Sequence, residues 1–152
     1  MSLRNFCIAA MAASSVLDWT AAPASAQHPP QSHGDPREAV VLNPAEAEAM
    51  LAGMRTYLET VQGIVGAVAE NDIGRVPAIA ARSGAKLLQK VPPATGLKAP
   101  IGFAMMSIDT HDKFDKLAEK ASRGTSRAEV LNDLRDIMGN CIGCHTSYRL
   151  AP

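Results

Sequence analysis

The spacing of apolar residues predicts a first amphipathic helix over about residues 44–70. Apolar side chains recur there every three or four positions, in one stripe centred near Met54. Asn43 and Pro44 open the helix, because asparagine is a favoured cap and proline loses no hydrogen bond in the first turn. We expect the stripe to face the interior; it consists of Ala47, Met50, Leu51, Met54, Leu58, Val61, Val65 and Val68.

Two further helices follow in the pattern. The second begins after Asn71-Asp72 and ends at Pro92-Pro93, and Pro77 limits how early it becomes regular, since proline is tolerated only in a first turn. The stretch PPATGLKAP is the longest loop signal of this region. The third helix spans roughly 100–122, and its expected apolar face is Phe103, Ala104, Ile108, Phe114, Ala118 and Ala121. Met105 and Met106 fall off that face.

The fourth helix has the clearest start. Ser126 and Glu129 form a capping box, which places the first helical residue at Arg127. The apolar stripe that follows is Val130, Leu134, Ile137, Met138, Cys141, Cys144, His145 and Tyr148. No segment alternates long enough to predict a strand. Four amphipathic helices with short connections predict an all-α fold, an antiparallel four-helix bundle.

The first 26 residues have the order of a secretory signal peptide. Arg4 precedes an apolar stretch from Phe6 to Leu17, and the small residues Ala24-Ser25-Ala26 supply a cleavage site. The apolar stretch is too short to span a bilayer, so we expect no stable membrane insertion after cleavage. Residues 27–42, which carry three prolines and no periodicity, predict a flexible, extended leader with His28 and His33 in solvent, and residues 43–152 form the helical domain.

Composition narrows the classes of function. The 152 residues carry 15 basic and 15 acidic side chains, and this neutral balance disfavours a nucleic-acid-binding protein. Three cysteines are an odd number, and Cys7 would leave with the signal peptide. Trp19 would leave with it, and the remaining four aromatic residues, Tyr57, Phe103, Phe114 and Tyr148, give a helix bundle little bulk. The interior therefore has room for another large, flat group.

The remaining cysteines form a haem-attachment motif. Cys141-Ile-Gly-Cys144-His145 is C-x-x-C-H, the signature of c-type cytochromes. On a helix the three side chains share one face, so two thiols can form thioethers to one macrocycle while the next imidazole reaches its iron. This predicts one covalently bound haem c and an exported, periplasmic protein, because haem is attached to thiols outside the cytoplasm.

Three other interpretations of the motif are weaker. A thioredoxin-type C-x-x-C belongs at a helix N-terminus, in a context of strands and helices. A zinc site needs a fourth ligand, and the sequence has no second Cys/His cluster with suitable spacing. A disulfide between positions i and i+3 of a helix has poor geometry and leaves His145 unexplained.

With this motif near its C-terminus, the chain resembles the class II c-type cytochromes, meaning cytochrome c′ and its low-spin, methionine-ligated relatives. The likeness covers roughly residues 44–149 and includes an ending of the form C-x-x-C-H-x-x-(Y/F)-R, here Cys141 to Arg149. The resemblance implies that Cys141 and Cys144 hold haem c, that His145 is the proximal ligand and that Arg149 lies near the haem. It also implies that two bundles could form a homodimer.

The sixth iron ligand has several candidates. In an antiparallel bundle the end of the fourth helix is level with the start of the first, where Met50 and Met54 both lie. We choose Met54, which is nearer the centre of the stripe and near the position from which the family supplies its distal residue. Met50, a vacant site and His111 are the alternatives. For His111 we favour a hydrogen bond to a haem propionate or a backbone carbonyl, and Arg55 could face a propionate or solvent.

These features predict an electron carrier and not an enzyme, since no carboxylate pair, nucleophile with its base, or phosphate loop is evident. A methionine thioether opposite histidine raises the reduction potential relative to two histidines. The electron-transfer partner would be another periplasmic redox protein. Two alternatives remain: a five-coordinate, gas-binding protein of the cytochrome c′ type, and a haem-bearing subunit of a periplasmic oxidoreductase.

Overall fold

The computed structural model describes residues 34–90 and 93–151, and most of this part of the chain is helical. The predicted signal peptide and leader residues 27–33, with His28 and His33, lie outside the described residues. The elements are β1 (Glu38–Val41), α1 (Pro44–Ala69), α2 (Val76–Ala80), α3 (Pro93–Lys98), α4 (Ile101–Ser122), α5 (Arg127–Ser147) and β2 (Tyr148–Ala151), with 3₁₀ turns at Ile73–Arg75, Ala81–Ser83 and Ala85–Lys90.

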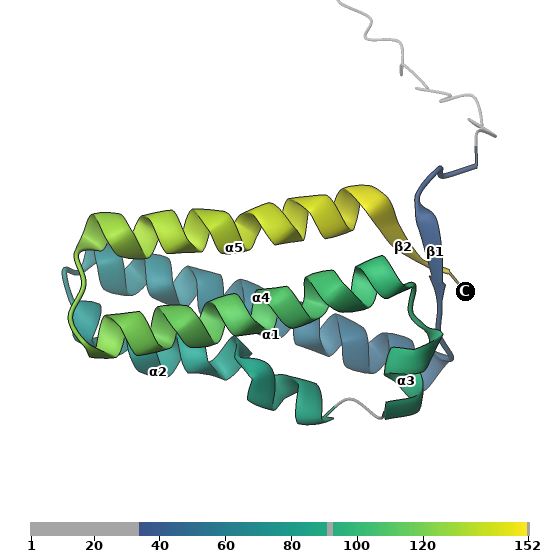
Figure 1. The fold of residues 1–152 in the computed structure, drawn as a ribbon, viewed down its shortest axis with the longest axis horizontal. Coiled ribbons are helices and arrows are strands. Elements are labelled where there is room, and N and C mark those ends of the chain that lie inside the picture. Colours follow the sequence, from purple (N-terminus) through teal and green to yellow (C-terminus); the bar gives the residue numbers. More distant parts are fainter. Residues whose placement is uncertain (1–33, 91–92, 152) are drawn as a thin grey trace, which may run out of the picture. The chain divides into compact units, whose positions relative to one another are not determined.

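The helices pack against one another in a ring. Within the unit formed by residues 35–152, α1 contacts α2 and α5, and α4 contacts the same two helices from the other side (Figure 1). The arrangement is compatible with the helical bundle that the sequence predicts. No helix in the described part of the chain is long and apolar enough to cross a membrane.

Two helix starts agree with the sequence prediction. Asn43 caps α1 by accepting a hydrogen bond from the Glu46 amide at 2.9 Å, and the Glu46 carboxylate accepts one from the Asn43 amide. Ser126 and Glu129 form the same reciprocal box at the start of α5, which begins at Arg127 as predicted. Each box satisfies two backbone donors that a helix N-terminus leaves without partners.

The prediction of one regular second helix is wrong. The segment from residue 73 to residue 90 consists of the short helix α2 between 3₁₀ turns, and Gly84 has extended backbone angles. The cause is close contact with α4: the Asp115 carboxylate accepts a hydrogen bond from the Ala85 amide at 2.8 Å, and a Cβ on Gly84 would lie 1.8 Å from the same carboxylate. The helix is thus interrupted where α4 approaches its backbone.

The predicted loop PPATGLKAP also contains structure. Residues Pro93–Lys98 form the short helix α3. Lys98 forms an ion pair with Glu46 at 2.7 Å, and the Thr95 hydroxyl donates to the same carboxylate at 3.3 Å. These contacts hold α3 beside the start of α1, so the loop prediction missed a helix that tertiary contacts support.

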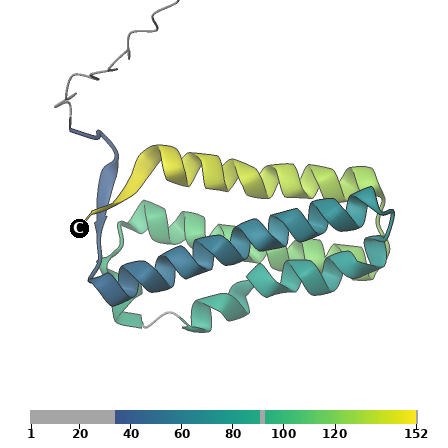
Figure 2. The same cartoon turned by 180° about the vertical axis from the view of Figure 1, so that it is seen from behind.

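The prediction of no strands is wrong as well. β1 and β2 pair in parallel, with Glu38 opposite Tyr148 and Val41 opposite Ala151, and both views show them side by side (Figures 1 and 2). Four residues of the predicted flexible leader therefore form a strand. The strands are too short for an alternating pattern, and each depends on a partner at the other end of the chain.

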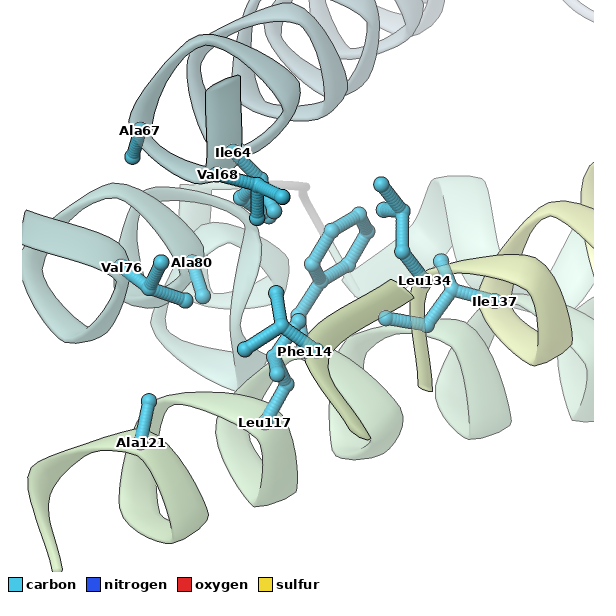
Figure 3. Close-up of a cluster of buried hydrophobic side chains, with 11 residues drawn as sticks. Ile64, Ala67, Val68, Val76, Ala80, Phe114, Leu117, Ala121, Leu134 and Ile137 are labelled. Carbon is cyan, nitrogen blue, oxygen red and sulfur yellow. The ribbon is translucent and has the colours of Figure 1, made fainter. Parts of the chain in front are cut away.

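The core lies between the four helices, around Phe114 of α4. Figure 3 shows its ring among side chains from α1 and α5, including Ile64 and Leu134. The apolar stripe predicted for α1 is partly wrong, because Leu51, Leu58 and Val65 are 42%, 70% and 47% exposed. The buried residues of α1 are Thr60, Ile64, Ala67 and Val68. Apolar residues occur on both sides of α1, so periodicity alone does not identify its buried face.

Candidate functional site

Helix α5 presents the three residues of the C-x-x-C-H motif to one small cavity. Cys141, Cys144 and His145 border this cavity, of about 50 Å³, together with Met54 of α1. Their spacing of three and four residues places them on one helix face. The remaining lining comes mainly from α4 and includes Phe103, Met106, Ser107 and Thr110.

Both motif thiols are partly buried and unbridged. Burial raises the pKa of Cys141, and burial together with the neighbouring Cys141 raises the pKa of Cys144. The Cys141 thiol donates a hydrogen bond to the Ile137 carbonyl, with a sulfur–oxygen distance of 3.7 Å. A catalytic redox C-x-x-C needs a lowered thiol pKa, so these surroundings disfavour that interpretation.

Two larger cavities adjoin the first. One, of about 250 Å³, is bordered by Cys144 and His145, and the other, of about 350 Å³, by Tyr57 and His111. Met54 and Phe103 border all three cavities. The lining of both larger cavities is mainly apolar. The space in front of the motif is therefore extended and apolar around these two side chains.

The structure distinguishes the positions of Met50 and Met54. Met54 borders both cavities that contain His145, whereas Met50 borders only the larger of the two. Both methionine side chains are partly buried. Of the two, Met54 is thus the one that shares a cavity with both cysteines and the imidazole.

His111 is engaged on both ring nitrogens. Its Nδ1 lies 2.8 Å from the Ser83 carbonyl, and its Nε2 lies 2.6 Å from the Tyr57 hydroxyl. Because a carbonyl only accepts, Nδ1 carries the proton and Nε2 accepts from Tyr57. The side chain is 4% exposed. The expected hydrogen bond to a backbone carbonyl is confirmed, and no ring nitrogen remains for a metal.

Two arginine side chains line the cavity of about 250 Å³ that His145 borders. Arg37 and Arg149 both border it. Arg37 forms an ion pair with Asp35 at 2.6 Å, and this contact lowers the pKa of Asp35 to about 2. The buried Nε of Arg149 has no hydrogen-bond partner within the described residues, and it lies 3.9 Å from the Asp35 carboxylate. Arg55, in contrast, is exposed and paired with Glu48.

Several lining residues were not identified from the sequence. Met106 borders the motif cavity, although the sequence placed it off the buried face, and Arg37 and Val40 come from the predicted leader. Phe103 was expected in the core, yet it borders the cavities and packs edge-on against Tyr148 with ring centroids 5.5 Å apart. Two features of the sequence could have identified these residues. Met106 lies next to the apolar stripe of its helix, and a run of four apolar residues precedes Asn43.

No protein-family model, no curated protein and no solved structure matches this chain. Among residues 34–90 and 93–151, no group of three or more His, Cys, Asp or Glu side chains could hold a metal ion.

Proposed function

We propose that this protein is a periplasmic monohaem c-type cytochrome of the class II type, an antiparallel four-helix bundle that transfers electrons. One observation carries the proposal: Cys141, Cys144 and His145 on α5 and Met54 on α1 border a single cavity. Two thiols would hold haem covalently, and an imidazole and a thioether would ligate its iron.

The surroundings of the motif fit such a group. Haem is large, flat and mostly apolar, and it carries two carboxylates. The three cavities around Met54 and Phe103 have mainly apolar linings, and the unpartnered, buried Nε of Arg149 borders the cavity beside His145. A buried N–H group without a hydrogen bond is costly, so a carboxylate that accepts from this Nε would relieve a defect of the described structure.

The pairing of β1 with β2 supports the choice of Met54. β1 immediately precedes α1 and β2 immediately follows α5, and the two strands pair. The beginning of α1 and the end of α5 are thereby held at the same end of the bundle. An antiparallel arrangement of these helices puts Met54 level with the motif, as the sixth-ligand assignment needs.

Each residue has a defined task in this account. Haem c, when bound, supplies an iron that exchanges one electron between its ferric and ferrous states. Cys141 and Cys144 would hold the group covalently, His145 would supply the proximal imidazole, and Met54 a thioether that favours the ferrous state. Phe103, which borders all three cavities, would exclude water from the group. Arg149 would bind a carboxylate.

A second function has one observation in its favour. The cavity of about 350 Å³ that Met54, Tyr57 and His111 border leaves space next to the thioether. If Met54 does not ligate the iron, that space would admit a small diatomic molecule. The protein would then be a five-coordinate gas-binding cytochrome of the cytochrome c′ type.

Absorption spectra of the purified protein distinguish the two functions. The electron carrier predicts low-spin spectra in both oxidation states and no ready reaction with carbon monoxide. Met54→Ala then yields a high-spin ferrous form that binds carbon monoxide. Met50→Ala and Met105→Ala, the latter at a residue that is 59% exposed, leave the spectra unchanged.

Two results would contradict the assignment. High-spin spectra in the unmodified protein would exclude Met54 as a ligand and favour the gas-binding function. A change of spin state in Met50→Ala instead of Met54→Ala would move the ligand by one helical turn.

A further inference from the structure

The segment just before α1 makes a direct contact with the backbone of the motif. Arg37 donates a hydrogen bond from Nη1 to the carbonyl oxygen of His145 at 3.2 Å. Its other guanidinium nitrogens bind the Asp35 carboxylate, Nε at 3.0 Å and Nη2 at 2.6 Å. One guanidinium thus joins the N-terminal segment to the residue that would ligate the iron.

The His145 carbonyl needs such a donor. It belongs to the last turn of α5, where carbonyl groups have no partner within the helix. The Tyr148 amide satisfies the Cys144 carbonyl, and the next carbonyl along the chain is that of His145. A cation at this point also interacts favourably with the helix dipole. Arg37 therefore acts as a side-chain cap on α5.

The strands hold Arg37 in place. A pair of four-residue strands is marginal by itself, and parallel pairs are slightly weaker than antiparallel ones. Val40 of β1 is fully buried and borders the same cavity as His145. Tyr148 of β2 packs edge-on against Phe103 of α4. The strand pair is thus fixed by packing against the cavity wall.

We propose that Asp35–Val41 is a clasp that holds His145, with Arg37 as its positioning residue. Through the strand pair and the cap on the His145 carbonyl, the clasp fixes the end of α5 and the direction of the imidazole. Its effect on an iron ligand rests on the proposed function. Its effect on the backbone at residues 145–151 does not.

Hydrogen exchange on the full protein tests the clasp without reference to haem. Arg37→Gln removes the cap, and we expect amides in residues 145–151 to exchange roughly tenfold faster, as the loss of one charge-assisted hydrogen bond implies. Amides in the middle of α4 should keep their rates. Arg55→Gln is the matched control, because Arg55 is also ion-paired on the surface, to Glu48 at 2.6 Å. Arg37→Lys keeps the positive charge, so the amides of residues 145–151 should exchange at an intermediate rate in this variant.

A vibrational measurement tests the positioning of the imidazole. In the ferrous Met54→Ala protein, the iron–imidazole stretching band reports how His145 is held. Adding Arg37→Gln should shift or broaden this band, Arg37→Lys should reverse part of the change, and Arg55→Gln should have no effect.

The outcomes separate the clasp from the proposed function. Unchanged exchange at 145–151 in Arg37→Gln overturns the clasp. Faster exchange with an unchanged stretching band overturns the positioning role and reduces Arg37 to a stabilising contact. A protein that carries no haem overturns the proposed function, and the exchange rates at 145–151 then decide the clasp by themselves.

Discussion

The hydroxyl of Tyr57 on α1 donates a hydrogen bond to Nε2 of His111 on α4 at 2.6 Å. His111 in turn donates from Nδ1 to the Ser83 carbonyl, and the Ser83 hydroxyl donates to Thr60 at 2.8 Å. This chain of buried polar contacts joins α1, the 3₁₀ turn at Ala81–Ser83 and α4. Burial raises the pKa of Tyr57, so its phenol stays protonated and remains a donor.

His111 should make stability depend on pH. Burial lowers its pKa below the ordinary value of 6.5. The unfolded chain then binds a proton more readily than the folded one, so this contribution to stability is complete above about pH 6.5 and declines as the pH falls. Thermal unfolding of His111→Gln should show less loss of stability below pH 6.5 than the unmodified protein. At pH 7.5 the variant should be about 1–3 kcal/mol less stable, because glutamine replaces the buried ring that hydrogen-bonds both Tyr57 and Ser83.

The other histidines are present in both proteins, so the difference between their pH profiles isolates His111. If both proteins lost stability equally as the pH falls, the conclusion that His111 is buried and neutral would be wrong. A change of iron spin state in His111→Gln would contradict the conclusion that both its ring nitrogens are occupied.

Phe114 and Leu58 should differ sharply in their contribution to stability. Phe114 is fully buried at the centre of the core, whereas Leu58 is 70% exposed. Phe114→Ala should lower the free energy of unfolding by about 3–5 kcal/mol, through lost burial and the cavity left behind. Leu58→Ala should change it by less than about 0.5 kcal/mol. Chemical denaturation measures both free energies of unfolding. A large loss of stability in Leu58→Ala would show that Leu58 is buried, as the apolar stripe predicted for α1 requires.

Two glycines test the interruption of the second helix. Gly84→Ala should destabilise the protein by about 1–3 kcal/mol, because the new methyl group would overlap the Asp115 carboxylate that caps the Ala85 amide. Gly66→Ala, inside α1 with open space at its Cβ position, should stabilise it by up to about 1 kcal/mol. If Gly84→Ala and Gly66→Ala shifted the denaturation midpoint equally, the contact between Gly84 and Asp115 would not be what interrupts the predicted second helix.

Local signals in the sequence were sufficient for the helix starts. The boxes at Asn43 and Ser126 need only residues three positions apart, and α1 and α5 begin where these boxes predict. The spacing of Cys141, Cys144 and His145 likewise needs one helical turn. These features depend only on residues that are close together in the sequence, so they can be predicted without knowing which distant segments pack together.

Features that depend on distant partners were missed. The strand Glu38–Val41 needs β2, more than a hundred residues later in the chain, and α3 needs Glu46 on α1. The buried face of α1 was misjudged because Leu58 and Ile64 are both apolar, and only contacts with α2, α4 and α5 select Ile64. Met106 was dismissed for the same reason, since its place at the cavity depends on how α4 faces α5.

Mass spectrometry of the purified protein under denaturing conditions tests the proposal of one covalently bound haem most directly. The protein would be produced with a haem-attachment system, beside the double variant Cys141→Ser, Cys144→Ser. The account predicts a chain that begins at Gln27, carries the added mass of one haem and retains it when unfolded, while the double variant has the mass of the bare chain. A protein whose two thiols remain free and whose mass shows no haem would contradict the account.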